Sequence, residues 1–322
     1  MKDIGIGIYG ANGHQIHGSI ANTKNCTLRG VAGFEPEKLA SAGLDAHPAV
    51  KYDSLDQMLK DPAIQLVSLC SPKRSNQASD AIKALNAGKH VYAEKPCAMT
   101  EAELDSILEA ADKNRMRFFE MTGTAFSEPY LTMRSLVKSG IIGEVVQVFV
   151  QKSYPLHDRR PQDENVDGGL LMQAGVHATR YIEHVAGTRI KDVYAIETTL
   201  GNPVEGGGLK MAASLMMRLE NSGVAAMIVN YLNQPGFGSW GNESLRIFGT
   251  KGFMEAVDAG KRTRLVVGGN DMGEIKTSGP GLNYLQLFIN NLVNNEPMPL
   301  SLEEELHPTR IVIRAKAAVK DI

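Results

Sequence analysis

Short apolar runs alternate with amphipathic stretches along the first 121 residues of the chain. The runs occupy residues 4–9, 27–32, 64–71, 91–94 and 117–121, and each has the length of one buried strand. The stretches between them carry apolar residues at helical spacing, and Thr100 and Glu103 form a capping box at the start of one. Strands and helices that alternate in this way predict an α/β Rossmann fold with a doubly wound parallel sheet.

The rest of the chain changes to a two-residue period. Apolar and polar residues alternate over 145–154, 193–200, 210–219, 224–232, 245–249 and 264–267, as in strands with one buried face. We therefore expect an α+β domain with a mostly antiparallel open sheet and helices on one side. The predicted domains are 1–123 and 124–322, and the last helix is open to assignment to either. The uncovered sheet face predicts a homodimer or homotetramer.

The composition argues against several classes of protein. The 322 residues carry a formal net charge of −2, so we expect no nucleic-acid partner. No apolar run approaches the ~20 residues that span a bilayer, so we expect no membrane partner either. The first strand pattern begins at Ile4, which leaves no room for a signal peptide, and the three cysteines form no C-x-x-C motif. These features predict a reduced cytoplasmic protein without a metal site.

A glycine-rich turn follows the first strand pattern. It contains Gly10, Asn12, Gly13 and His14, and a helix pattern comes after it. Glycines at this place let the backbone approach a pyrophosphate, which rests on the helix N-terminus. Asn12 stands where a second glycine is expected. The turn predicts that the first domain binds a dinucleotide.

The sequence leaves the choice between NAD and NADP open. An acid about 20 residues past the glycines would bind the ribose hydroxyls of NAD. Glu35 stands near that position, but the position directly after the second strand pattern is Gly33. Glu35 followed by Pro36 also reads as the start of a helix, and the two interpretations have equal support.

A second part of the predicted cofactor cleft lies at the end of the apolar run over residues 64–71. Ser71 and Pro72 end that pattern, and Lys73 and Arg74 follow. Carboxyl ends of parallel strands line the ligand cleft of such folds. The two cations either contact phosphates or are solvated loop charges, and we slightly favour the second interpretation, although Arg74 remains a candidate for NADP.

Lys95 is the strongest candidate for a catalytic residue. It follows the apolar run that ends at Glu94 and precedes Pro96, which cannot continue a strand ladder. Glu94 and Lys95 would therefore stand at the rim of the cofactor cleft. The ordinary alternative is a solvated, inert surface lysine.

At this point the residues resemble a known family. The segments Gly10-x-x-Gly13, Ser71-Pro72, Gly88–Pro96 and Gly140–Val145 are similar to those of the glucose–fructose oxidoreductase / inositol dehydrogenase / MocA family. The resemblance covers nearly the whole chain, and its most specific part is the G-K-H-V-x-x-E-K-P block that contains Lys95.

The resemblance implies further site residues in the second domain. In this family a helix carries G-G-x-L-x-D-x-G-x-H, whose aspartate and histidine face the nicotinamide near the lysine. His177 matches the histidine, but Gln173 stands at the aspartate position, and Arg180 stands at a further acidic position. Taken alone, a histidine on an apolar helix face is more often a core residue, and the resemblance reverses that weighting.

Two loops add candidates for substrate binding. Arg160 lies in the charged loop 155–167, which is either a binding loop or ordinary surface. Trp240 lies in the glycine-rich loop 236–241, where it either lines the substrate pocket or packs the loop down.

The implied activity is hydride transfer between nicotinamide and a carbinol carbon of a sugar, cyclitol or sugar acid. Lys95 would be the base, which requires its pKa to fall by about three units from ~10.4. Gln173 cannot take a proton. Either Lys95 and His177 suffice, or Arg180 binds a substrate carboxylate, or the chain binds cofactor without turnover. The alternative functions are an NAD-dependent glycosidase and a non-catalytic nucleotide-binding sensor.

Overall fold

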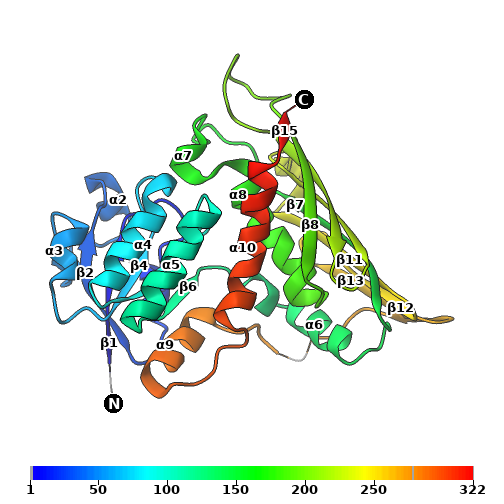
Figure 1. Cartoon of the computed structure of the whole chain (residues 1–322), viewed down its shortest axis with the longest axis horizontal. Helices are drawn as coiled ribbons and strands as arrows, with labels where there is room; N and C mark the ends of the chain where they lie inside the picture. Colours follow the sequence, from blue (N-terminus) through cyan, green and yellow to red (C-terminus); the bar gives the residue numbers. More distant parts are fainter. Residues whose placement is uncertain (1–2, 278, 322) are drawn as a thin grey trace. The chain divides into compact units, whose positions relative to one another are not determined.

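The structure is a computed structural model that describes residues 3–277 and 279–321. The chain divides into two compact units, and several segments return from one unit to the other (Figure 1). Unit 1 contains Met1–Thr122, Asn165–Gly168 and Asn283–Leu306, and unit 2 contains Gly123–Glu164, Gly169–Leu282 and His307–Ile322. No helix in the described ranges is long and apolar enough to cross a membrane.

Unit 1 is built on a parallel sheet that, over the described residues, has six strands in the order β3-β2-β1-β4-β5-β6. This order confirms the predicted Rossmann fold, and its topological switch point lies between β1 and β4. The strands β1, β4 and β5 are almost wholly buried, which explains their continuous apolar runs. The bounds are β1 Ile4–Tyr9, β2 Cys26–Ala32, β3 Val50–Lys51, β4 Leu66–Leu69, β5 His90–Ala93 and β6 Phe118–Glu120.

The helices of unit 1 begin and end where local sequence signals place them. The capping box of Thr100 and Glu103 is present at the start of α5, and the Ser54 hydroxyl caps α3. Helix α9 belongs to this unit because Phe288 packs against the rings of Tyr92 and Phe119. The bounds are α1 His17–Ile20, α2 Pro36–Ser41, α3 Leu55–Leu59, η1 Arg74–Asn76, α4 Gln77–Asn86, α5 Glu101–Asn114 and α9 Tyr284–Asn294.

Unit 2 contains a mostly antiparallel open sheet, as predicted. Over the described residues it has nine strands in the order β14-β13-β12-β11-β7-β10-β9-β8-β15, and only the β7–β10 and β8–β15 pairs are parallel. The two-residue pattern missed the strands β12, β14 and β15. The bounds are β7 Val145–Ser153, β8 Ile190–Thr198, β9 Ala212–Leu219, β10 Val224–Asn230, β11 Asn242–Gly249, β12 Gly252–Val257, β13 Arg262–Val267, β14 Asn270–Gly273 and β15 Lys320–Asp321.

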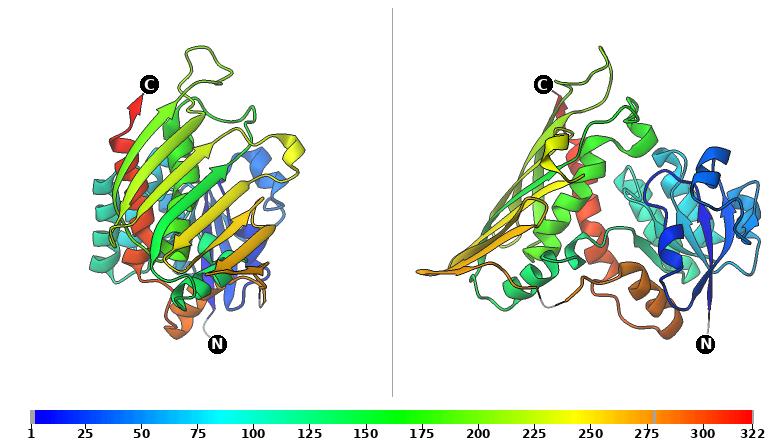
Figure 2. Two further views of the ribbon diagram at one scale, coloured as in Figure 1. Left: turned by 90° about the vertical axis from the view of Figure 1, so that its right-hand side faces the viewer. Right: turned by 180° about the vertical axis from the view of Figure 1, so that it is seen from behind.

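Helices cover one face of this sheet, as Figure 2 shows. Helix α8 contacts β7, β9 and β10 and continues into a π-helical turn, η3. The opposite face carries exposed apolar side chains, among them Tyr194 and Met216, which are 66% and 68% exposed. The remaining bounds are η2 Thr124–Phe126, α6 Tyr130–Lys138, α7 Glu164–Asp167, α8 Gly169–Arg180, η3 Tyr181–Val185, η4 Pro235–Phe237 and α10 Leu302–Ala317.

The start of α6 has no serine cap. Ser127 precedes this helix, and its hydroxyl donates to the carbonyl of Thr124 at 2.9 Å. Helix α6 begins after Pro129 without a side-chain cap. Two residues separate Ser127 from the helix, so its hydroxyl reaches the preceding turn instead.

Candidate active site

The glycine-rich turn of unit 1 needs glycine at two positions. Gly10 has φ +72°, and a Cβ there would lie 2.1 Å from the carbonyl oxygen of Cys70. Gly13 has φ +126°, and a Cβ there would lie 2.6 Å from Cγ of Glu94. Both backbone conformations are strained for residues with a side chain. The turn is therefore closely packed on the ends of β4 and β5.

Glu94 is a buried carboxylate beneath this turn, and only 1% of it is exposed. It accepts hydrogen bonds from the backbone N–H of His14 at 3.2 Å and from Nδ1 of the same residue at 3.1 Å. Burial alone would raise the pKa of Glu94, but the His14 hydrogen bond and the positive charges of Lys95 and Arg74 outweigh burial and lower it. Glu94 therefore remains ionised and ties the turn to β5.

Arg74 is buried beside the turn, with 1% of its surface exposed. Its Nη2 donates to the carbonyl of Asn12 at 2.6 Å, and among the described residues its Nε and Nη1 have no partner. The interpretation of Arg74 as a solvated loop charge is therefore wrong. The Asn12 carbonyl of the glycine-rich turn accepts a hydrogen bond from the guanidinium.

Asn12 connects the turn to two other segments. Its Nδ2 donates to the carbonyl of Pro72 at 3.2 Å and to the carbonyl of Val166 at 2.6 Å. A glycine at this position could make neither bond. The side chain that replaces the expected glycine thus holds the Ser71–Pro72 loop and the short segment 165–168 against the turn.

Two polar residues in this region were missed from the sequence. Gln15 donates from Nε2 to the Gly10 carbonyl at 3.0 Å, and its Oε1 accepts from the Ser68 hydroxyl at 2.6 Å. Asp80 accepts the Ser71 hydroxyl at 2.7 Å, and burial raises the pKa of this carboxyl. In the sequence, these two residues are distinguished only as polar residues that follow a buried strand.

A glycine occupies the position directly after β2, where an acid that binds ribose is expected. Gly33 is the first residue after β2 and has φ +71°. A Cβ at this position would lie 2.5 Å from the Tyr9 ring. Glu35 is exposed and immediately precedes α2, whose first residue is Pro36. The helix-start interpretation of Glu35 is therefore correct, and ribose binding by Glu35 stays a prediction.

Lys95 is the second residue after β5 and is 2% exposed, so it is not a solvated surface lysine. Its position beyond the carboxyl end of a central strand is where ligands of this fold class bind. The neighbouring chain is also fixed, since the N–H of Cys97 donates to the buried Glu120 carboxylate at 2.7 Å. The side chain therefore stands on a rigid support.

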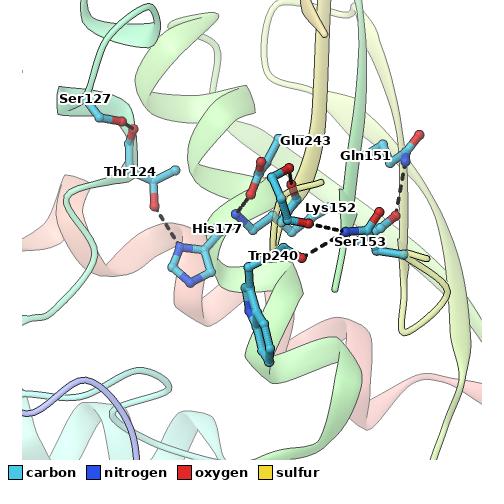
Figure 3. A network of polar contacts seen from close by, with 11 residues as sticks. Thr124, Ser127, Gln151, Lys152, Ser153, His177, Trp240 and Glu243 are labelled. Carbon is cyan, nitrogen blue, oxygen red and sulfur yellow. Dashed lines mark hydrogen bonds and ion pairs between the residues drawn. The ribbon is translucent and has the colours of Figure 1, made fainter. Parts of the chain in front are cut away.

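In unit 2, helix α8 carries Gln173 and His177 one turn apart. Both are partly exposed, while most residues around them on the helix are buried. His177 Nδ1 lies 2.7 Å from the hydroxyl of Thr124, which belongs to η2 (Figure 3). This hydrogen bond fixes the orientation of the imidazole. Thr124 was not predicted from the sequence.

Arg180 lies in the interior of unit 2 and is 0% exposed. Its Nη1 donates to the Val176 carbonyl at 2.8 Å, and its Nη2 donates to the Thr309 hydroxyl at 3.2 Å. The guanidinium thus links α8 to α10. This placement favours a structural role over the predicted contact with substrate.

A buried ion pair was also missed. Lys152 on β7 and Glu243 on β11 lie opposite each other and form a close salt bridge, with side chains 9% and 13% exposed. Burial lowers the pKa of Lys152, and Glu243 opposes that shift. Figure 3 shows this pair, His177 and Trp240 in one region of unit 2.

The two loop candidates lie close to the ends of these strands. Trp240 is 59% exposed, and its ring lies 5.7 Å from the ring of His157. The Arg160 guanidinium lies 3.8 Å from the centre of the Tyr231 ring. Both side chains therefore contact an aromatic ring of a neighbouring residue.

Comparison with known families assigns both halves of the chain. The model described as an oxidoreductase family with an NAD-binding Rossmann fold matches residues 4–122. The model of the GFO/IDH/MocA C-terminal domain matches residues 130–255. The chain belongs to the Gfo/Idh/MocA family. It is accordingly an oxidoreductase with an NAD(P)-binding Rossmann domain, and the family resemblance of the sequence is confirmed.

Individual relatives support this assignment across most of the chain. Myo-inositol 2-dehydrogenase of Thermotoga maritima is 22% identical over 79% of this chain and 77% of its own length. An oxidoreductase structure from Thermotoga maritima has a TM-score of 0.88 and 25% identity, and covers 98% of this chain and 97% of that one. An aldose–aldose oxidoreductase from Caulobacter crescentus, crystallised with glycerol, has a TM-score of 0.83 and 20% identity, with coverage of 98% and 97%.

Proposed function

We propose that this Gfo/Idh/MocA protein oxidises or reduces a carbinol carbon of a sugar, cyclitol or sugar acid, with NAD or NADP as the hydride carrier. The observation that carries the proposal is Lys95, a buried lysine beyond the end of β5, next to a glycine-rich turn that Glu94 and Arg74 hold in place. The name of a relative, myo-inositol 2-dehydrogenase, supports a polyol as substrate.

The glycine-rich turn has the properties that a dinucleotide requires. Gly10 and Gly13 leave the turn without a side chain at two positions. The buried Arg74 places a positive charge beside the turn, and its Nε and Nη1 have no partner within the described part of the chain. When bound, the nicotinamide would accept or donate the hydride. No acid fits at Gly33 beside Tyr9, and Nη2 of Arg74 already donates to the Asn12 carbonyl. We therefore expect weak discrimination between NAD and NADP.

Lys95 would hold the transferred proton. A lysine that acts as base near neutral pH needs an environment worth about 4 kcal/mol against its charged form. His177 is oriented by Thr124 and would position the substrate hydroxyl. Gln173 offers hydrogen bonds but no proton transfer, so we assign it to substrate orientation.

The first test is cofactor binding followed by turnover. Thermal shift with NAD and NADP measures binding, and absorbance of the reduced nicotinamide measures turnover on sugars, cyclitols and sugar acids. Lys95→Met should keep the cofactor-induced shift and lose turnover about 10²- to 10⁴-fold. The matched control is Lys83→Met, since Lys83 is an exposed residue paired with Asp56.

The same experiment separates the alternatives that Gln173 leaves open. Cofactor binding without turnover on any alcohol, together with cleavage of a glycoside and no net NADH, would indicate the NAD-dependent glycosidase. Cofactor binding with neither reaction would indicate a nucleotide-binding sensor.

The exposed apolar face of the unit 2 sheet supports the proposal of a homodimer or homotetramer. Tyr194, Ile196 and Met216 lie on this face and are 44% to 68% exposed. A contiguous apolar surface of this kind is uncommon on a monomer. Light scattering of the purified protein measures the mass directly.

A further inference from the structure

Three cations of unit 2 are candidates for recognising a charged substrate, and two of them are already neutralised or enclosed. Arg180 is 0% exposed and links α8 to α10. Lys152 is paired with Glu243, so the pair presents no net charge. Arg160 is different, because no carboxylate among the described residues lies within ion-pairing distance of it.

Arg160 is nevertheless held in a fixed position. Its guanidinium lies 3.8 Å from the centre of the Tyr231 ring and 5.9 Å from that of Tyr154, and Nη2 donates to the Pro155 carbonyl at 3.2 Å. Its Nε has no partner among the described residues. Aromatic stacking orients the planar guanidinium and its N–H donors without neutralising the positive charge. This arrangement suits bidentate binding of a carboxylate.

Arg160 is connected to the region that contains His177. Its backbone N–H donates to the His157 carbonyl at 3.0 Å, and the His157 ring lies 5.7 Å from the Trp240 ring. Figure 3 shows Trp240 together with His177 and the Lys152–Glu243 pair. The pair also reaches this loop, since Nζ of Lys152 lies 5.1 Å from the Tyr154 ring that Arg160 shares.

We propose that Arg160 binds the carboxylate of a sugar acid, and that the neutral Lys152–Glu243 pair binds its hydroxyl groups. This rests on the proposed oxidoreductase function and narrows its substrate class. An ammonium beside a carboxylate offers both a donor and an acceptor, which matches neighbouring hydroxyls. A single uncompensated positive charge matches a monoanionic carboxylate better than a dianionic phosphate ester.

The structural alternative is that Arg160 only covers the Tyr231 ring, which is 1% exposed. That role would make replacement of Arg160 lower stability and weaken all ligands alike. A role in carboxylate recognition makes the loss selective for acids. The two roles are therefore separable by comparing matched acidic and neutral ligands in one variant.

The test is a binding titration that does not require turnover. Trp240 is the only tryptophan of the sequence, so its fluorescence reports on this region. D-Gluconate and D-glucuronate would be compared with D-glucose, myo-inositol and D-glucose 6-phosphate, with and without NAD or NADP. The variants are Arg160→Met, Arg160→Lys and the matched control Arg159→Met, which alters an exposed arginine of the same loop.

We expect the wild-type protein and Arg159→Met to bind a sugar acid more tightly than its neutral counterpart. Arg160→Met should weaken the acid roughly 10- to 100-fold and the neutral sugar little, with Arg160→Lys between them. Equal or tighter binding of neutral ligands or of the phosphate ester, equal losses for all ligands, or no acid binding would each overturn the proposal. If the Arg160 proposal failed but a neutral polyol were turned over, the oxidoreductase function would still stand. If a sugar acid bound selectively but no substrate were turned over, the Arg160 assignment would stand and the oxidoreductase function would fail.

Discussion

Replacement of Glu94 by glutamine tests whether a buried charge network holds the glycine-rich turn. A glutamine carbonyl can still accept the backbone N–H of His14, so that hydrogen bond survives. The lost interaction is the negative charge that faces Lys95 and Arg74, which are 2% and 1% exposed. Removal of one partner from a buried charge network costs about 3–5 kcal/mol. The contact with the His14 ring adds little, since that side chain is 78% exposed.

The assay is urea unfolding of the Glu94→Gln variant, followed by circular dichroism at neutral and acidic pH. The folded-state pKa of Glu94 lies below its ordinary value, so its contribution is complete above the ordinary pKa and is lost as the pH falls through the folded one. The difference in unfolding free energy between wild type and variant should therefore be about 3 kcal/mol or more at pH 7 and shrink in acid. Glu109→Gln, an exposed control on α5, should stay within about 0.5 kcal/mol of wild type. A Glu94→Gln variant within about 1 kcal/mol of wild type at pH 7 would refute the reasoning.

Three further predictions follow from single contacts. Gly13→Ala should weaken NAD binding by calorimetry and cost about 1–2 kcal/mol of stability, because its φ is +126°, whereas Gly18→Ala meets no atom within 4 Å and should do neither. Thr124→Val should lower kcat/KM roughly 2- to 10-fold and change the pH profile, because His177 loses its hydrogen bond; an unchanged profile would contradict this. Met216→Asp should convert the proposed oligomer into monomers, as measured by light scattering, and an unchanged mass would remove this face from the interface.

The first unit could be predicted from local patterns because its decisive interactions are local. Buried parallel strands require continuous apolar runs, and helix caps such as Thr100 with Glu103 are set by residues three apart. The strand order then follows from the right-handed connections of such folds. The antiparallel sheet was also predicted, although the interior strand β12 and the edge strands β14 and β15 were not found.

The site could be predicted only in part, because its contacts join distant segments. The partners Thr124 and His177 are 53 residues apart, and Lys152 and Glu243 are 91 apart. Nothing in the local pattern pairs them. The positions of Lys95, Glu94 and Gly13 follow from strand ends, but burial of Arg74 depends on carbonyls of the glycine-rich turn 62 residues earlier.

Arg180 and Arg160 illustrate the same limit. An arginine on a helix and an arginine in a charged loop look alike in sequence, and the position of Arg180 in the family pattern made it the stronger candidate for a substrate carboxylate. The structure encloses Arg180 between Val176 and Thr309 and holds Arg160 against Tyr231. Burial, which sequence alone does not give, separates the two.

The central claim is that Lys95 supports hydride transfer in a cofactor-loaded protein. The most direct measurement is a single-turnover experiment that follows reduced nicotinamide in wild type and in Lys95→Met, each saturated with NAD or NADP and given the same panel of sugars, cyclitols and sugar acids. The account predicts a nicotinamide signal in wild type and a rate at least about 10²-fold lower in the variant, with unchanged cofactor affinity. Equal rates in both proteins would contradict the assignment of Lys95, and cofactor binding without any signal in wild type would contradict the proposed dehydrogenase.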